Sequence, residues 1–469
     1  MKIPYTINKN TLEAYKPSAQ TKELLSEQLR KVIAENFEWD KDQCPSLEEF
    51  CISTIAKYFQ EKPLIDELPG HDWVLLLDEL ALDLPLEFAI PVIFDEYYWE
   101  KRFKKVFRFC WRKKLPNWTW KGIYLERHCQ KLIEEGEPQY NDEESFGEIL
   151  DLCNPYVTRL YIEQLQTWKP PLTMAREDIP EVWPIEHLNM IPIFKKLQNI
   201  QELDITFGMK NVGEDFTWDM FEVSHADVQK LSKAILELQS LKILRIHRSN
   251  LDFKHCQILI RTLVKCFTVE VLDLSHCQIG DTGAMCIGYL LKEGTNLKVL
   301  NLTDNKIGKI GAEALGFGIL QGKCGYLNDL NLRLNPLKTE GAMGIMRCLV
   351  RSGTPKRISM AACMFEEDTP LKVCQMLKLN DTLKKLDISS NYFGEECGDY
   401  LVEAVSLNTC IEWIDCREID INQSQKEQID EFLLRNRKAA QLEAKINRLE
   451  NDEAEIEVEE NNFEFPLSI

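Results

Sequence analysis

Hydrophobic positions recur in a fixed order along the chain from about residue 200 onward. The stretches LKVLNLTDNKIGKIGA from Leu297 and LKKLDISSNYFGEECG from Leu383 both carry apolar residues at their first, fourth, sixth and eleventh positions. The fourth positions are spaced by 28 residues in five of six intervals and by 30 in the other. This regularity predicts a series of stacked structural units, whose fourth positions are Leu244, Leu272, Leu300, Leu330, Ile358, Leu386 and Ile414.

Each unit is expected to form one short strand followed by one helix. In the strand, alternation buries Leu300 and Leu302 and turns Asn301 and Thr303 outward. At the ninth position, the side chain of Asn or Cys can form hydrogen bonds with backbone groups left free between units. The second half of each unit has apolar residues at helical spacing. The pattern is that of the leucine-rich repeat. It predicts an α/β solenoid of the ribonuclease-inhibitor-like class, with a 28-residue period, parallel strands inside and helices outside.

Two earlier segments fit the first half of the repeat but stand farther apart. NIQELDI surrounds Leu203 and YVTRLYI surrounds Leu160, so the gaps to the following units are 41 and 43 residues. We therefore expect a leucine-rich-repeat domain over residues 151–422, with insertions near 168–190 and 208–221. Insertions in solenoids lie in surface loops and often bind partners, so both segments are candidate binding elements. The alternative is that they are insertions that the fold tolerates and that have no function.

The two ends of the chain differ from the repeats. Residues 1–150 have helical spacing, and a capping box of Ser46 and Glu49 opens one helix, so an α-helical N-terminal cap and docking domain is expected there. Residues 423–450 are predicted to form a C-terminal helix. The acidic segment 451–469 should be disordered when free, because it lacks basic residues in its first part and repels itself.

A basic segment interrupts this acidic chain, whose formal net charge is -20. KRFKKVFRFCWRKK, residues 101–114, contains eight Lys or Arg and no acid. Its aromatic and aliphatic residues fall at helical spacing, which predicts an amphipathic helix with an apolar stripe packed into the cap. The charged face is either simply solvated, or docks on an acidic protein, or serves calmodulin-like or RNA recognition. The candidate docking residues are Lys101, Lys104, Lys105, Arg108 and Arg112.

Composition narrows the function classes. A sequence pI near 5.0 opposes general binding to nucleic acid. The N-terminus lacks a signal-peptide pattern and no apolar run approaches about 20 residues, so we expect a soluble, intracellular chain without membrane insertion. The 16 cysteines form no C-x-x-C pair and the seven histidines show no metal-binding spacing. No nucleotide-binding or nucleophile motif is present, which predicts no catalytic residue, no cofactor and no metal.

The outward strand positions are the candidate partner-binding surface. They are polar or small, as a protein-binding face or a solvated sheet would be. Arg333 is the strongest single candidate, because its planar guanidinium suits carboxylates. The candidate positions on the concave face are Asp273, Ser275, Asn301, Thr303, Asn331, Arg333, Ser359, Ala361, Asp387 and Ser389.

Several short stretches outside the repeat consensus carry a family resemblance. They are ENFEW at 35–39, DLPLEFA at 83–89, YYW at 97–99, YLERH at 124–128, LCNPYVTRLYIEQ at 152–164, FTWDMF at 216–221, NLRLN at 331–335 and NRKAA at 436–440. With them, the chain resembles the leucine-rich-repeat subunit 5 family of the nexin-dynein regulatory complex from about residue 35 to 440. The basic segment and the acidic tail lie outside what this resemblance explains.

The resemblance implies a non-catalytic scaffold in the axoneme of motile cilia and flagella, within the cytoplasmic cytoskeleton. Its partners would be other subunits of that hetero-oligomeric complex, with inner dynein arms and the tubulin of doublet microtubules as further candidates. Two alternatives remain open from the residues. A Ran-type GTPase-activating protein would use Arg245 or Arg248 at the transition state, and a cytosolic inhibitor would hold an enzyme inside the horseshoe.

Overall fold

The structure is a computed structural model of the 469-residue chain. It describes residues 46–63, 68–107, 118–140, 147–171, 173–175, 177–181, 183–210, 212–213, 216–322, 326–394 and 397–461. The chain divides into two compact units, Met1–Phe88 and Ala89–Ile469. The N-terminal domain expected over residues 1–150 is thus split, because its later helices pack with the repeats.

The described part of the first unit is helical. It contains α5 (Leu47–Lys57), α6 (Gly70–Glu79) and the start of α7 (Leu86–Val92). The predicted capping box is present at α5, where Ser46 N–H donates to Glu49 Oε2 at 2.8 Å and Glu49 N–H donates to Ser46 Oγ at 3.2 Å. Phe59 is fully buried and meets Phe88 edge to face.

The second unit begins with a group of helices. They are α8 (Glu96–Val106), α9 (Trp120–Glu135), the 3-10 helix η1 (Pro138–Tyr140) and α10 (Gly147–Cys153). In this group α9 packs on the first strand, and α8 and α10 pack on α9. Glu126 on α9 accepts the backbone N–H of Arg159 at 3.0 Å, and Glu134 accepts that of Glu163 at 2.8 Å. These carboxylates occupy donors that an open sheet edge would expose, so α9 closes the solenoid at its first repeat.

Lys121 holds α9 in this cap. Its Nζ donates to the backbone carbonyls of Ile90 at 2.6 Å and Ile93 at 3.2 Å, and to the hydroxyl of Tyr156 at 3.1 Å. Burial lowers the pKa of this amine to about 8, although Glu96 opposes the shift.

The repeats form one parallel sheet of nine strands in sequence order. Every predicted fourth-position residue sits in this sheet, and Leu160, Leu203 and Leu244 are register partners in neighbouring strands, as are the later ones. The predicted α/β leucine-rich-repeat solenoid is therefore confirmed. The strands are β1 (Arg159–Ile162), β2 (Glu202–Ile205), β3 (Ile243–Ile246), β4 (Val271–Asp273), β5 (Val299–Asn301), β6 (Asp329–Asn331), β7 (Arg357–Ser359), β8 (Lys385–Asp387) and β9 (Trp413–Asp415).

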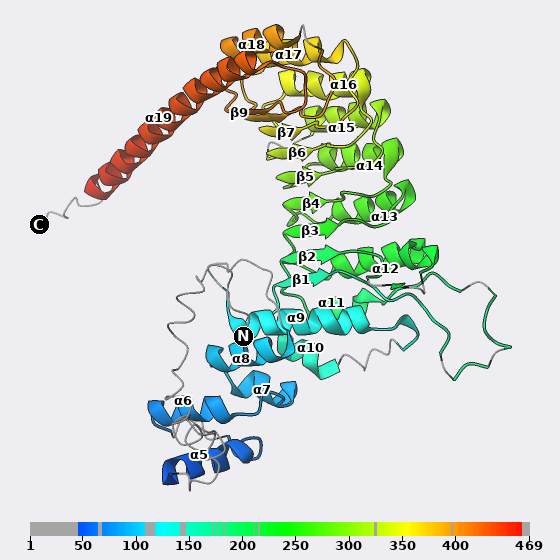
Figure 1. Ribbon diagram of the computed structural model, residues 1–469, viewed down its shortest axis with the longest axis vertical. Coiled ribbons are helices and arrows are strands. Elements are labelled where there is room, and N and C mark those ends of the chain that lie inside the picture. Colours follow the sequence, from blue (N-terminus) through cyan, green and yellow to red (C-terminus); the bar gives the residue numbers. More distant parts are fainter. Residues whose placement is uncertain are drawn as a thin grey trace, which may run out of the picture. The chain divides into compact units, whose positions relative to one another are not determined.

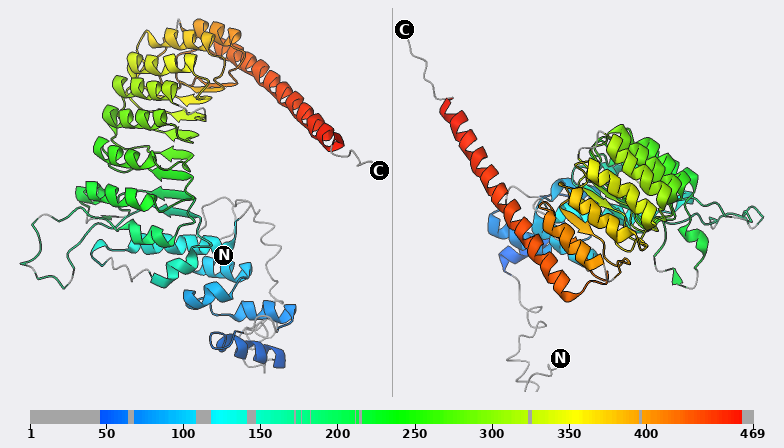
Figure 2. Two further views of the ribbon diagram at one scale, coloured as in Figure 1. Left: turned by 180° about the vertical axis from the view of Figure 1, so that it is seen from behind. Right: turned by 90° about the horizontal axis from the view of Figure 1, so that it is seen from above.

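The helices of the repeats stack in a second layer beside the sheet, as Figures 1 and 2 show. Small residues let them approach closely: a Cβ on Gly318 of one helix would lie 2.2 Å from the backbone oxygen of Gly288 on the preceding one. These helices are α11 (Met190–Lys196), α12 (His225–Ile235), α13 (Phe253–Leu263), α14 (Gly280–Glu293), α15 (Lys309–Gln321), α16 (Lys338–Arg351), α17 (Thr369–Leu379) and α18 (Cys397–Leu407). In the described part of the chain, no helix is both long and apolar enough to cross a membrane.

Buried amides join successive repeats at the predicted ninth positions. Asn335 Nδ2 donates to Leu302 O at 2.8 Å and to Leu332 O at 2.9 Å, and its Oδ1 accepts the backbone N–H groups of Asn305 and Ile307. Asn391 repeats the arrangement by accepting Cys363 N–H at 2.8 Å. Each amide satisfies backbone groups that the strand ladder leaves unpaired.

The last repeat is closed by α19 (Gln423–Asn461). Asn436 Nδ2 donates to the carbonyls of Asn408 and Ile411, both at 2.9 Å, while Ile429 and Leu433 are buried. The helix continues beyond the boundary expected at residue 450, and the expectation that 451–469 is disordered when free stays a prediction. Once its first turns are anchored, each further residue adds a backbone hydrogen bond without a new nucleation cost. Residues 462–469 of the acidic tail lie outside the described residues.

We expect Asn335→Ala to lower the free energy of unfolding by about 3 kcal/mol or more, because several buried backbone groups lose their partner. Chemical denaturation monitored by circular dichroism measures this loss. Asn296→Ala is the matched control, since Asn296 is exposed and its side chain donates one hydrogen bond to Phe267 O. Equal effects of the two substitutions would contradict the structural role of the buried amides.

Candidate functional site

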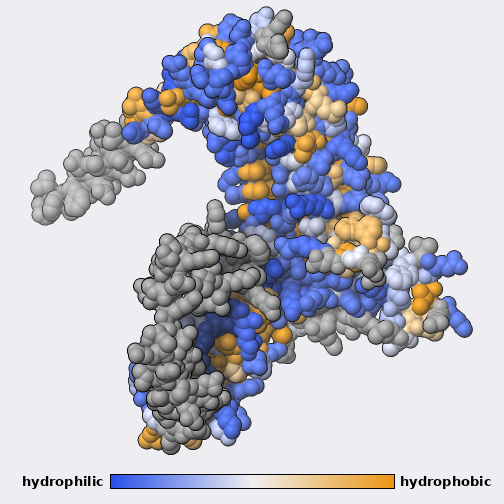
Figure 3. All heavy atoms as spheres, in the orientation of Figure 1, coloured by the Kyte–Doolittle hydropathy of each residue, from blue (hydrophilic) through white to orange (hydrophobic). Residues whose placement is uncertain are grey.

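A hollow runs along the strand face of the solenoid. It has a volume of about 440 Å³ and is lined by outward side chains from β3 to β9. Apolar Val271 and Val299 lie in its floor, and Figure 3 shows a small hydrophobic strip over the strands beside a largely hydrophilic surface. The hollow combines apolar area with charged sides, as protein-binding surfaces do.

The predicted concave residues divide into two groups. The fifth positions Asp273, Asn301, Asn331, Ser359 and Asp387 do line the hollow. They are linked across strands: Asn301 Nδ2 donates to Asp273 Oδ2 at 2.9 Å, and Ser359 Oγ donates to Asp387 Oδ2 at 2.8 Å.

The seventh positions differ from the prediction, except for Arg333. Ser275, Thr303, Ser389 and Ala361 are buried, with at most 8% of their surface exposed. The strand has ended there and the chain bends, so the hydroxyls turn back on the fifth position. Thr303 Oγ1 donates to Asn301 Oδ1, and Ser389 Oγ donates to Asp387 Oδ1, both at 2.7 Å. These residues shape the strand ends and are not available to a partner.

The sequence analysis missed the third positions of the repeat. They also face the hollow, because a residue two places before an outward residue points to the same side of a strand. The alternation of the strand was the signal that could have found them. They are Val271, Val299, Asp329, Arg357, Lys385 and Trp413.

Two unpaired cations lie on the C-terminal half of the strand face: Lys385 lines the hollow, and Arg333 follows β6 and is not among the residues that line it. Arg333 is exposed, and among the described residues neither Arg333 nor Lys385 forms an ion pair. By contrast, Arg357 pairs with Asp329, and Arg417 holds Asp415 through Nε at 2.9 Å and Nη2 at 2.6 Å. Arg417 lowers the pKa of Asp415, and the charge of Arg333 adds to that shift.

An exposed aromatic lies in the same part of the hollow. The side chain of Trp413 from β9 retains 42% of its exposure. A partly exposed Trp beside the unpaired Lys385, its register partner, is suited to a partner segment that carries both carboxylates and apolar groups.

The N-terminal half of the strand face is internally paired. Arg245 forms an ion pair with Glu202, and His247 Nδ1 lies 3.1 Å from Asp204 Oδ1. The contact with the Asp204 carboxylate raises the pKa of His247, against the effect of burial. Arg245 is therefore held in place by a carboxylate and is poorly suited to reach a nucleotide.

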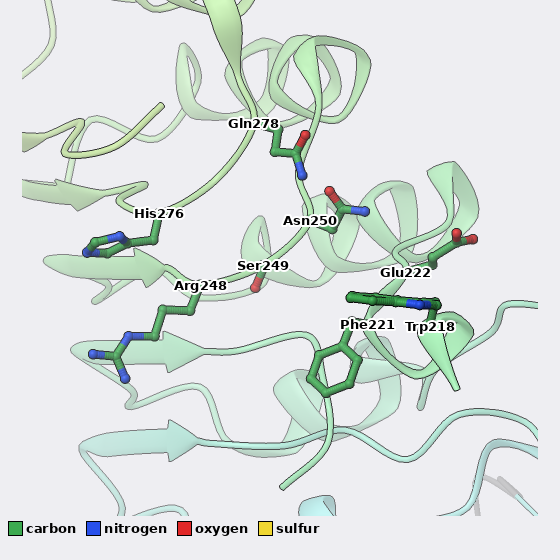
Figure 4. Close-up of a pocket in the computed structure, with 8 residues that line it drawn as sticks. All are labelled: Trp218, Phe221, Glu222, Arg248, Ser249, Asn250, His276 and Gln278. Atoms are coloured by element: carbon green, nitrogen blue, oxygen red, sulfur yellow. The ribbon is translucent and has the colours of Figure 1, made fainter. Parts of the chain in front are cut away.

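The second insertion builds a separate pocket of about 530 Å³. Trp218 and Phe221 belong to the 3-10 helix η3 (Trp218–Phe221), and Figure 4 shows them and Glu222 on the helix side, with Arg248 and His276 on the strand side. Trp218 keeps 77% of its surface exposed and meets Phe216 edge to face. An exposed aromatic pair on an insertion is consistent with the predicted binding role of this segment.

The basic segment is only partly described, and its expected helix is interrupted. Helix α8 ends at Val106, and Phe107 adopts extended backbone with φ -116° and ψ 99°, so a single helix over 101–114 is wrong. Phe107 turns to pack on Tyr124, with ring centroids 5.6 Å apart. Phe103 is buried as predicted, but Val106 is 46% exposed.

The candidate cations of this segment are partly engaged within the chain. Lys104 Nζ lies 2.6 Å from Glu100 Oε1, and Lys101 lies over the ring of Tyr97. Lys105 is exposed. Arg108 and Arg112 lie outside the described residues, so the docking role of the segment remains a prediction.

Comparison with known proteins identifies the repeats and finds relatives of the family that the sequence resembles. A Leucine Rich repeat family model matches residues 265–288, 295–316 and 323–346. Dynein regulatory complex subunit 5 of Mus musculus is 32% identical over 268 residues, which are 55% of this chain and 53% of that protein. The predicted resemblance is confirmed. The subunit 5 of Chlamydomonas reinhardtii is 28% identical over 44% of this chain and 48% of its own length.

A ribonuclease inhibitor of Mus musculus is also similar, at 27% identity over 47% of this chain and 48% of the inhibitor. This similarity agrees with the predicted ribonuclease-inhibitor-like class of leucine-rich-repeat solenoid. The chain spans about half the length of the curated relatives it matches.

We expect the pKa of His247 to lie above the usual 6.5 and to fall in Asp204→Asn, because the amide removes the negative charge. Since the folded pKa is raised, the pair stabilises the fold fully below pH 6.5 and loses this contribution as pH rises through the folded pKa. An NMR titration of the imidazole signals measures the shift, with the other histidines as internal reference. An unchanged His247 titration in the variant would contradict the pairing.

Proposed function

We propose that this chain is a non-catalytic scaffold of the dynein regulatory complex in motile cilia and flagella. The observation that carries the proposal is its similarity to curated subunit 5 proteins of that complex from mouse and from a green alga. In this role it would be held in the axoneme, would link outer doublet microtubules with the other subunits, and would help to regulate dynein-driven motility.

The geometry of the repeats supports a scaffold. The sheet is covered at its first strand by α9 and at its last repeat by α19, so the stack is closed at both ends. Its strand-face hollow and its insertion pocket are different surfaces, formed by different residues. A stacked framework with separate surfaces can hold several partners at fixed geometry. We propose neighbouring complex subunits as its main partners, with inner dynein arms and tubulin as further candidates.

The two alternatives are not favoured. A GTPase-activating protein would need a free arginine near a nucleotide, but Arg245 is paired with Glu202. Arg248 lines the insertion pocket, beside Trp218 and Glu222, in a site with no phosphate cradle among its lining residues. An enzyme inhibitor of the ribonuclease-inhibitor type would use the concave face, yet the subunit 5 of Mus musculus matches a larger share of the chain at higher identity, 55% at 32% identity against 47% at 27%.

We expect the endogenously tagged chain to remain in isolated axonemes after detergent extraction. Crosslinking mass spectrometry should then join the strand-face hollow and the α8 segment to regulatory-complex subunits or to tubulin. Release of the whole population with the detergent-soluble fraction would overturn the axonemal role.

Reversing charge on the strand face tests its role directly. Arg333→Glu combined with Lys385→Glu should weaken partner retention about tenfold or more, because both unpaired cations become repulsive toward an acidic partner. Quantitative immunoblotting of axonemes, with circular dichroism of the purified variant, measures retention and folding. Lys292→Glu with Lys309→Glu is the matched control, since these lysines are exposed on the outer helices. Loss of retention in the control alone would place the contact on the helical side.

The basic segment is tested by Lys104→Glu, Lys105→Glu and Arg108→Glu in one variant. We expect this variant to fold but to lose assembly into the axoneme, because its charges no longer suit an acidic neighbour. Lys131→Glu is the control, as Lys131 forms a comparable surface pair with Glu135 on α9. Normal assembly of the triple variant would leave the segment as a solvated face.

A further inference from the structure

Two histidines and a carboxylate meet where α12 and α13 begin. One candidate ligand atom from each of His225, Asp252 and His255 lies within 4.8 Å of the others. The rings of His225 and His255 have centroids 4.5 Å apart. These residue types are the usual ligands of borderline transition-metal ions such as Zn²⁺.

The period of the repeat creates this cluster. Ser224 caps α12 and Asp252 caps α13, and they are equivalent positions of neighbouring repeats, 28 residues apart. The third helical positions are likewise equivalent: Asp227 completes the capping box of α12 and His255 that of α13. His225, the first residue of α12, is thereby set beside His255. Linear spacing could not reveal the site, since the ligands come from two repeats.

His255 has a nitrogen without a partner. Only 6% of its side chain is exposed, and Nε2 forms no hydrogen bond. Nδ1 lies 2.8 Å from Asp252 Oδ1 and 3.1 Å from the backbone nitrogen of Asp252. Nδ1 is thus the ring nitrogen that can share an ion with the Asp252 carboxylate, in place of the Asp252 N–H, while Nε2 keeps the ring proton.

The neighbouring carboxylate of Asp227 is already occupied. It accepts His187 N–H at 3.0 Å, lies 3.0 Å from His187 Nδ1, and accepts Ser224 Oγ at 2.7 Å. Asp227 therefore adds negative charge near the cluster without serving as a ligand. This charge offsets the positive ends of the two helices, which by themselves disfavour a cation.

We propose that His225, His255 and Asp252 form a binding site for a divalent transition-metal ion, tested here as Zn²⁺. Nδ1 of His255 supplies the buried ligand. His225 is exposed and Asp252 half-buried, so the fourth coordination position is open to solvent or to a partner side chain. The ion would join α12 to α13 next to the insertion that carries Trp218. The sequence predicted no metal site, and the proposal does not depend on the axonemal role.

The experiment is a Zn²⁺ titration of the purified full chain in competition with a chromogenic chelator. We expect one site of micromolar affinity, and we expect His225→Ala and Asp252→Asn each to weaken it at least tenfold. Asp252→Asn keeps a side-chain oxygen that can cap α13, so its effect reports on the lost charge and not on folding. Circular dichroism verifies the fold of each variant, and a defect in one leaves the other decisive.

Two matched controls separate this site from adventitious binding. His71→Ala removes an exposed histidine from the first unit, and Cys51→Ser removes an exposed thiol; neither should change the affinity. Co²⁺ in place of Zn²⁺ should show ligand-field absorption without a thiolate charge-transfer band. Absence of binding, unchanged affinity in both cluster variants, or a thiolate band lost in Cys51→Ser would overturn the proposal.

Discussion

Burial of one row of side chains across nine strands is the constraint on which this structure depends. The fourth-position residues from Leu160 to Ile414 are register partners from strand to strand, and nearly all are fully buried. A repeat cannot bury this row alone, because each strand has only three or four residues and gains its cover from the strands beside it. Stability, register and the placement of every surface residue follow from stacking.

Stacking alone leaves some backbone groups between repeats without hydrogen bonds and leaves the first and last repeats uncovered. Backbone groups between repeats require partners, which buried amides such as Asn335 and Asn391 supply. The terminal repeats require cover, which α9 and α19 provide through side-chain contacts to backbone groups, namely Glu126 with Arg159 N–H and Asn436 with Asn408 O. The helices α9 and α19 therefore stabilise the solenoid, and the regions that contain them are also candidate docking elements.

The surfaces differ in how freely they can engage a partner. Charges on the first strands are mostly paired with one another, as in Arg245 with Glu202. In the second half, by contrast, Arg333 is exposed and unpaired, and the unpaired Lys385 lies beside the exposed Trp413. Cations that are already paired contribute little to a new interface, while unpaired ones can be desolvated against a carboxylate. The second half of the strand face is accordingly the half that we propose for protein binding. The insertion adds an aromatic surface on another side of the same repeats.

The amino-acid sequence by itself determined the repeat, its strands and helices, the buried fourth and sixth positions and the structural role of Asn335, because these depend on periodicity alone. The fifth positions of the hollow followed from the same alternation. Tertiary structure decided the rest. It buried Ser275 and Thr303 because the chain bends after each strand, and it ended α8 at Val106 because Phe107 packs on Tyr124. It also brought His225 beside His255, since contacts between repeats depend on how neighbouring helices stack and not on distance along the chain.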